Sequence, residues 1–199
     1  MTAQDAAQEM DQRAINIAEA AMRIVLRYGM ARTTMSDVAQ EAGISRQTLY
    51  AIFSSKDELL RAIIRHLANR TVSEIEAAFA RSNDLGERLD AVIWQTAGRS
   101  FELLRASPDA DDIVSGFNAA CKEELEHNSA RYRALIEEML KPYEHNISDA
   151  GMTVPSLADF IQKSTLTIKH EARDMTHVKA LSGSLKALVL HVAAEGEKR

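Results

Sequence analysis

Apolar residues recur every three or four positions through most of this chain, the spacing that places them on one face of an α-helix. The run from Arg13 to Tyr28 is typical, with Ile17, Ile24 and Val25 on one stripe. No segment alternates apolar and polar residues with the period of two that a half-buried strand shows. The pattern therefore predicts an all-α protein of about eight or nine helices. These helices are expected at about residues 13–28, 34–42, 45–53, 55–79, 85–106, 109–117, 119–146, 155–170 and 175–192.

The stretch from Thr33 to Leu59 carries the strongest local indications of helix ends. Thr34 is a favourable N-cap, and the carboxylate three residues later suits the positive end of the helix dipole. Gly43 can adopt the left-handed conformation that ends a helix, and Ser45 can cap the next helix. Two short helices joined by a turn that contains glycine make a helix-turn-helix.

A long helix is expected directly after this motif. Ser55 and Glu58 have the S-x-x-E spacing of a capping box at its start. It is predicted to run to about Phe79, which is longer than a DNA-binding head needs, so it is expected to connect to a second unit. We therefore predict a helix-turn-helix DNA-binding domain at residues 1–57 and a larger helical domain at residues 58–199.

The composition narrows the class of protein further. The chain has 199 residues, 46% of them hydrophobic, and a net charge of -5, which argues against nucleic-acid coating by the whole chain but not against a local DNA-reading patch. No apolar run of about 18 residues is present, so no membrane span is expected. The polar N-terminus is unlike a signal peptide, and the single cysteine, Cys121, excludes an intrachain disulfide. These features favour a cytoplasmic protein.

The predicted second helix of the motif opens with residues that suit base recognition. A recognition helix enters the major groove with its N-terminus first. Arg46 can grip a guanine edge and Gln47 has the amide geometry that pairs with adenine, whereas Thr48 suits a thymine methyl or a phosphate. An ordinary exposed charge is the alternative for Arg46. Lys56 lies in the first turn of a helix, where backbone N–H groups favour an anion, so Lys56 and Thr34 are predicted phosphate contacts.

The same stretch resembles the DNA-binding head of the TetR family of bacterial transcriptional regulators. The resemblance extends over the first quarter of the chain. It rests on the order and spacing of Thr33-Thr34, Val38-Ala39, Ala42-Gly43-Ile44-Ser45, Thr48-Leu49-Tyr50, Phe53 and Ser55-Lys56. Two positions depart from the family pattern. Gln47 stands where a small residue is frequent, and Ile52 stands where Tyr or His is common, which weakens the expectation of a phosphate contact at residue 52.

The resemblance implies a three-helix head, a connecting helix and a larger body that binds an inducer and forms a homodimer through its last two helices. It also implies a phosphate contact for the Tyr50 hydroxyl, with a half-buried core ring as the alternative. The last two predicted helices, at about residues 155–192, carry apolar faces that suit dimerisation. The expected function is that of a homodimeric repressor, released from a palindromic operator in double-stranded DNA by a small-molecule inducer. A ligand-independent activator or architectural DNA binder is the alternative.

The residues of the body identify neither an inducer nor a cofactor. Adaptable or polar side chains on apolar faces are candidate pocket-lining residues, although core packing is the simpler interpretation of each. These candidates are Trp94, Phe101, Phe117, Cys121, Tyr132, Met139 and His170.

An enzyme is the remaining alternative. Glu124 and His127 form one Glu-x-x-His element, but a di-iron site needs two such elements and further inward glutamates. Cys121 has no evident catalytic partner and is expected to be an inert buried thiol. We therefore expect no enzyme activity, no metal and no cofactor.

Overall fold

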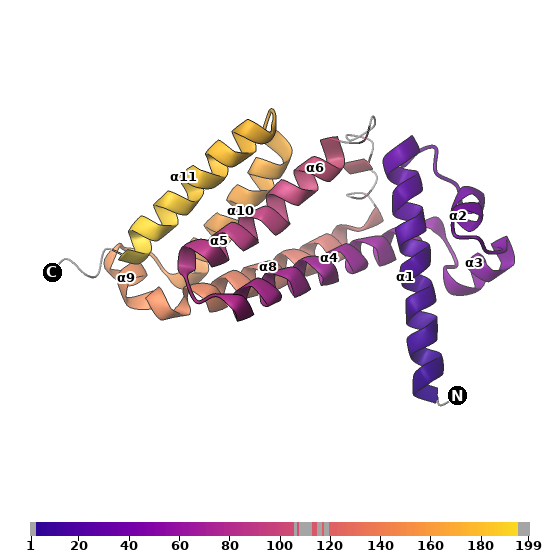
Figure 1. The fold of residues 1–199 in the computed structure, drawn as a ribbon, viewed down its shortest axis with the longest axis horizontal. Helices are drawn as coiled ribbons and strands as arrows, with labels where there is room; N and C mark the ends of the chain where they lie inside the picture. Colours follow the sequence, from indigo (N-terminus) through magenta and orange to yellow (C-terminus); the bar gives the residue numbers. More distant parts are fainter. Residues whose placement is uncertain (1–2, 106, 108–112, 115–116, 118–119, 195–199) are drawn as a thin grey trace. The chain divides into compact units, whose positions relative to one another are not determined.

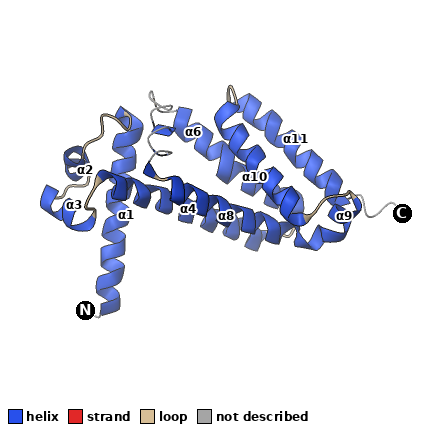
Figure 2. Ribbon diagram, turned by 180° about the vertical axis from the view of Figure 1, so that it is seen from behind, coloured by secondary structure: helices blue, strands red, loops and turns tan. Residues whose placement is uncertain are grey.

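The computed structural model confirms the predicted all-α fold over the residues it describes (Figure 2). These are residues 3–105, 107, 113–114, 117 and 120–194, so the helix predicted at 109–117 falls largely outside them. The elements in chain order are α1 (Ala3–Tyr28), α2 (Met35–Glu41), α3 (Arg46–Ile52), α4 (Lys56–Arg81), α5 (Leu85–Ile93), the π-helix η1 (Trp94–Gly98), α6 (Arg99–Arg105), α8 (Lys122–Leu140), the 3-10 helix η2 (Lys141–Tyr143), α9 (Glu144–Asp149), α10 (Val154–Glu171) and α11 (Met175–Ala194).

Two helix boundaries differ from the apolar pattern for simple reasons. α1 begins at Ala3, well before the predicted start at Arg13, because the preceding residues are mostly Ala, Gln, Glu and Met, which favour helix without an apolar stripe. The predicted helix at residues 119–146 is divided at Pro142, where η2 separates α8 from α9. Proline lacks the backbone N–H that an α-helix needs at that point, so the α-helix is interrupted there.

The predicted helix at residues 85–106 contains a feature that periodicity does not indicate. One turn of π-helix, η1, joins α5 to α6. Gly98 has no side chain, and the ring of Trp94 lies over it, as close as 2.4 Å to where a Cβ would stand. The Thr96 hydroxyl donates to the Val92 carbonyl at 2.7 Å and so satisfies a backbone acceptor within the distorted turn. The wider turn is thus stabilised locally.

The chain divides into two compact units, and each has a core of its own. The first comprises Met1–Asn69 with Leu103–Glu126, and the second comprises Arg70–Glu102 with His127–Arg199. α4 contributes its first half to one unit and its second half to the other. This structural boundary does not coincide with the predicted functional division at residue 57, which stays a prediction.

The core of the first unit holds the helix-turn-helix together. Val25 of α1, Val38 of α2 and Leu49 of α3 are fully buried, and Ile63 of α4 is 1% exposed. Both α2 and α3 lie on one side of α1 (Figure 1). Burying side chains of this size stabilises the unit by about 1.5–3 kcal/mol each. Leu49 therefore fixes α3 against the other helices of this unit.

The second unit is organised around α10 and α11. These two helices lie side by side and antiparallel, as their three-residue connection requires (Figure 1). Ile161 of α10, Val189 of α11 and Leu89 of α5 are fully buried in one core. The Gln162 amide of α10 donates to the Ser129 carbonyl of α8 at 2.9 Å, so α8 is tied to the same core.

Candidate nucleic-acid interface

The start of α2 is fixed by a complete capping box. The Asp37 backbone amide donates to the Thr34 hydroxyl oxygen at 3.3 Å, and the Asp37 carboxylate accepts from the Thr34 backbone N–H at 3.0 Å. The Thr34 hydroxyl also donates to that carboxylate at 2.7 Å. Thr34 is exposed, so the predicted phosphate-contacting side chain is accessible, although its hydroxyl proton is engaged by Asp37. The hydrogen bonds between Thr34 and Asp37 thus confirm Thr34 as the predicted N-cap of α2.

The turn between α2 and α3 requires the glycine that the sequence provides. Gly43 has φ of 66°, in the left-handed region, and its N–H donates to the Gln40 carbonyl at 3.1 Å. Ser45 then caps α3, because its hydroxyl oxygen accepts from the Thr48 amide at 3.0 Å. The Thr48 hydroxyl lies 2.8 Å from that of Ser45. Thr48 thus belongs to the cap as well as to the exposed edge of α3.

The outer edge of α3 presents the predicted base-reading side chains to solvent. Arg46 and Gln47 are exposed, and neither has a hydrogen-bond or ion-pair partner among the described residues. Tyr50 is 44% exposed, so its ring is partly buried while its phenol edge meets solvent, and the phosphate contact and the half-buried ring both stay open. On the opposite edge Leu49 and Phe53 are buried. α3 is therefore anchored on one side and carries a guanidinium, an amide and a phenol on the other.

Ile52, the second departure from the family pattern, does not share that open edge. Its side chain is half-buried and packs against the core of the first unit. An aliphatic side chain offers no hydrogen-bond donor to a phosphate, so its role here is packing.

The start of α4 is capped differently from the predicted box. The Ser55 hydroxyl oxygen accepts from the Glu58 amide at 3.2 Å, as predicted. The Glu58 carboxylate, however, accepts from the Ser54 backbone N–H and hydroxyl, each at 2.7 Å, and not from Ser55. These hydrogen bonds from Ser54 hold the pKa of Glu58 below its usual value. The return half of the box is thus shifted by one residue.

Lys56 is half-buried, and its ammonium faces the interior of the first unit. Nζ donates to the Met30 carbonyl at 2.6 Å and to the Thr33 carbonyl at 2.8 Å. Both carbonyls belong to the turn between α1 and α2. Two of the three ammonium N–H groups are therefore used inside the protein, and the predicted phosphate contact of Lys56 stays a prediction.

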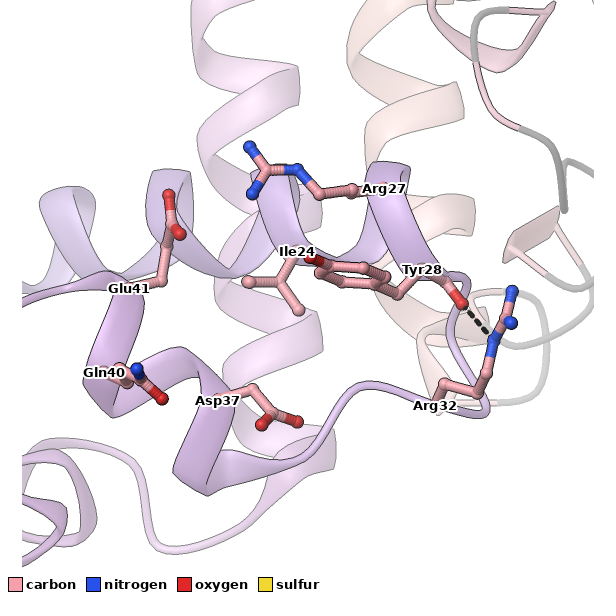
Figure 3. Close-up of a pocket in the computed structure, with 7 residues that line it drawn as sticks. All are labelled: Ile24, Arg27, Tyr28, Arg32, Asp37, Gln40 and Glu41. Atoms are coloured by element: carbon pink, nitrogen blue, oxygen red, sulfur yellow. Dashed lines mark hydrogen bonds between the residues drawn. The ribbon is translucent and has the colours of Figure 1, made fainter.

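A hollow of about 660 Å³ opens between α1 and α2. Figure 3 shows the Tyr28 ring in it, next to Arg27. The Arg27 guanidinium carbon lies 5.8 Å from the centre of that ring, within reach of a cation–π interaction, and Arg32 Nε donates to the Tyr28 carbonyl at 2.7 Å. The sequence did not indicate this hollow, because its walls come from two helices whose crossing is set by tertiary packing. The lining residues are Ile24, Arg27, Tyr28, Arg32, Asp37, Gln40 and Glu41.

The two carboxylates of this hollow are already engaged in local structure. Hydrogen bonds from Thr34 lower the pKa of Asp37, and the hydrogen bond from Arg23, at 2.8 Å, lowers the pKa of Glu41. Both groups are therefore ionised at neutral pH. Proton transfer requires a pKa near the working pH, so neither group suits general acid–base chemistry.

Four of the seven predicted pocket-lining residues belong to the cores of two different units. Phe117 and Cys121 are buried in the first unit, whereas Phe101 and Met139 are buried in the second. Burial raises the pKa of the Cys121 thiol to about 11, with Glu124 adding to the effect, as expected for an inert buried thiol.

The other three candidates all lie in the second unit. Trp94 is 43% exposed and His170 is exposed on α10. Tyr132 is half-buried, and burial raises the pKa of its hydroxyl. The seven residues are thus divided between two cores and the surface, and their role in ligand binding stays a prediction.

The glutamate of the Glu-x-x-His element is engaged by arginines. The Glu124 carboxylate lies 3.6 Å from Arg65 Nη1 and 3.9 Å from Arg61 Nε, both on α4. Within the described part of the chain, no three His, Cys, Asp or Glu side chains come together as a metal site would need. Of the helices described, none is long and apolar enough to cross a membrane.

The family model matches this chain over the predicted DNA-binding head, whereas the likeness of the body to known proteins is one of fold. Residues 17–63 match the family model described as bacterial regulatory proteins, tetR family. The HTH-type transcriptional regulator BetI of Agrobacterium fabrum is 35% identical over 77 residues, which is 39% of this chain and 37% of that protein. The chain thus aligns with little more than a third of the length of that relative.

Solved structures extend the likeness to nearly the whole chain, at the level of fold. A TetR transcription regulator from Haloarcula marismortui superposes with a TM-score of 0.70 at 17% identity, covering 88% of this chain and 95% of that one. The multidrug binding protein EbrR, complexed with imidazole, superposes with a TM-score of 0.54 at 20% identity, covering 87% and 94%. Residues 17–63 thus match the TetR family of bacterial regulatory proteins, and the chain has the fold of solved TetR-family regulators.

Proposed function

We propose that this protein is a sequence-specific DNA-binding transcriptional regulator that acts as a homodimeric repressor in the cytoplasm. The observation that carries the proposal is the outer edge of α3, where Arg46, Gln47 and Tyr50 are exposed within a helix-turn-helix that matches the TetR family. This is a family of regulators and not of enzymes. The enzyme interpretation of Glu124 is set aside for that reason.

On this proposal the residues of the head divide by task. Arg46 and Gln47 contact base edges, for which bidentate guanidinium and amide pairs are suited. Thr34, Thr48 and Tyr50 contact the phosphate backbone, which positions α3 without reading the sequence.

Selection of bound DNA from a random pool is the direct test. A regulator of this kind enriches a near-palindrome whose half-sites lie about 34–36 Å apart, one turn of B-DNA. Failure to enrich any sequence at any salt concentration would refute the proposal.

Variants of the base-reading residues make the same test sharper. Arg46→Ala and Gln47→Ala are each expected to weaken discrimination at one base pair by about 1–3 kcal/mol. Arg70→Ala removes an arginine of α4 that is also exposed but lies outside the head, and it serves as the matched control. Loss of affinity without any change in sequence preference would reassign Arg46 or Gln47 to the phosphates.

The homodimer is proposed to form through α10 and α11. Phe160 and Leu166 of α10 are 51% and 41% exposed, and Leu188 of α11 is 57% exposed. Exposed large apolar side chains on two adjacent helices are what a protein–protein interface would cover. Leu188→Glu is expected to convert the dimer into a monomer in sedimentation experiments and to lower operator affinity, whereas the exposed Lys179→Glu is the control on the same helix. A wild-type monomer at micromolar concentration would contradict this part of the proposal.

Release by a small-molecule inducer is the remaining element. It is supported by the likeness of fold to a multidrug binding protein whose structure holds a small ligand. Coupling between two sites is reciprocal, so an inducer that weakens operator binding by a given factor must itself bind the operator complex more weakly by the same factor. Fluorescence of Trp94, the single tryptophan, provides one measurement of ligand binding, and titration of a labelled operator provides the other. A ligand that binds the free protein and the operator complex with equal affinity would contradict its role as an inducer.

Repression, as opposed to activation, is tested by transcription from a promoter that carries the selected operator. A repressor lowers transcription, and addition of inducer restores it. An increase on addition of the protein would favour the activator.

A further inference from the structure

The ammonium of Lys56 joins two segments of the head that are distant in sequence. Lys56 is the first residue of α4, and its Nζ donates to the carbonyls of Met30 and Thr33, 26 and 23 residues earlier. We propose that Lys56 is a positioning residue, which ties the turn between α1 and α2 to α4 and thereby sets where Thr34 meets the DNA backbone. This inference rests on the proposed DNA-binding function.

The turn that Lys56 contacts is tightly folded, and the two residues whose carbonyls it binds are buried. Gly29 begins it with φ of 84°, a left-handed conformation that favours glycine. Met30 and Thr33 are 5% and 4% exposed, and the Thr33 hydroxyl donates to the Gly29 carbonyl at 2.7 Å. The next residue is Thr34, the N-cap of α2. Any displacement of this turn therefore moves the proposed phosphate contact.

The two carbonyls need the ammonium to different degrees. The Met30 carbonyl also accepts from the Thr33 backbone N–H at 3.3 Å. For the Thr33 carbonyl, the Lys56 ammonium is the hydrogen-bond partner that the described residues show. A buried carbonyl that loses its partner costs free energy, so the turn is expected to rearrange when the ammonium is removed.

Lysine suits this task because its ammonium is compact and carries three donors. Among the described residues, no carboxylate lies within ion-pair distance of Lys56 Nζ, so carbonyl dipoles are what stabilise the charge. One N–H is left over. A direct phosphate contact through that N–H is the competing explanation of the lysine in this position.

The two explanations predict different results for the free protein. In Lys56→Met, amide hydrogen exchange at Thr33 and Asp37 is expected to accelerate about tenfold or more, because both amides are held by this turn and by the cap that follows it. Exchange at Leu49, in α3, is expected to stay unchanged. A phosphate contact predicts no change in exchange without DNA, and a role in global stability alone predicts faster exchange at all three amides.

Operator binding provides the second measurement. Lys56→Met is expected to lower affinity about tenfold, while the slope of log affinity against log salt concentration stays unchanged. Loss of a direct phosphate contact instead reduces the magnitude of that negative slope by about 0.9. Lys56→Arg keeps the charge but replaces the compact ammonium with a larger planar fork, so it is expected to show the same faster exchange and weaker binding in a folded protein.

The outcomes separate cleanly. Faster exchange confined to Thr33 and Asp37, with weaker binding at an unchanged salt slope, supports the positioning role. Unchanged exchange, a salt slope whose magnitude falls by about 0.9, or exchange that rises equally at Thr33, Asp37 and Leu49 each overturns it. If the wild-type protein selects no operator, the proposed function fails, and exchange in the free protein still decides whether Lys56 holds the turn.

Discussion

Gly98, in the π-helix η1, is a position where adding a single methyl group is expected to destabilise the protein. An ideal Cβ there would lie 2.4 Å from Cε3 and 2.8 Å from Cζ3 of Trp94. These distances are far below van der Waals contact, so in Gly98→Ala the indole has to leave its place over the helix. The substitution thus tests whether the Trp94 ring can pack over the helix only because residue 98 has no side chain.

The magnitude follows from two opposing effects. Replacing glycine by alanine within a helix normally stabilises it by about 0.5–1 kcal/mol. Crowding a packed position costs about 1–3 kcal/mol. The net expectation is a loss of about 1 kcal/mol, which lowers Tm by about 2–4 °C for a chain of this size.

Gly183 provides the matched control within the same chain. It lies in α11, its φ is not in the left-handed region, and apart from its chain neighbours and the backbone of its own helix no atom lies within 4 Å of its ideal Cβ. Gly183→Ala is therefore expected to gain about 0.5–1 kcal/mol of stability. The same chemical change is predicted to have opposite signs at the two positions.

Chemical unfolding followed by fluorescence measures both effects, since Trp94 is the only tryptophan. Gly98→Ala is expected to shift the native emission to the red, because the displaced indole becomes more exposed to water. Molar mass is measured alongside, since Gly183 lies on a helix of the proposed dimer. If Gly98→Ala stabilises the protein as much as Gly183→Ala and leaves the emission unchanged, the reasoning is refuted.

Three further predictions concern the caps and the thiol. Gly43→Ala is expected to cost about 1–2 kcal/mol in thermal unfolding, because φ of 66° is unfavourable for alanine; an unchanged Tm would contradict this. Thr34→Ala is expected to cost about 0.5–2 kcal/mol. Because hydrogen bonds from Thr34 lower the pKa of Asp37 below 3.8, they stabilise the folded state above that pH, and this contribution is lost on acidification. The difference in Tm between Thr34→Ala and wild type should therefore shrink from about pH 5 downwards, and a constant difference would exclude the carboxylate's part. Cys121, with a thiol pKa of about 11 and no exposure, is expected to resist a thiol reagent at pH 8 until the protein unfolds, so rapid labelling of the native protein would contradict its burial.

The helix-turn-helix was predictable because its determinants are local. The Thr34 cap involves residues three apart, and Ser45 caps α3 over the same separation. Gly43 needs only its own backbone freedom. Each of these features depends only on residues within one turn of helix, so it can be predicted without knowing the tertiary fold.

The roles that could not be predicted depend on contacts across the fold. Nothing in the sequence around Lys56 indicates that its ammonium reaches carbonyls 23 and 26 residues away. The sequence likewise does not indicate the π-helical turn at Trp94, because one wider turn hardly changes the spacing of apolar residues along the helix. Periodicity indicated that Phe101 and Phe117 face inward, but not that they belong to the cores of different units.

The division of α4 between the two units bears on how the proposed repressor would be released. α4 has 26 residues, so it is about 39 Å long. A tilt of about 5° at one end of such a helix displaces the other end by about 3.4 Å, the rise of one base pair. On the proposed dimer, a ligand that favours a slightly tilted α4 would therefore place each α3 out of register with its half-site. On this proposal α4 need not break, because a small tilt of a helix of this length is enough to shift its far end by the rise of one base pair.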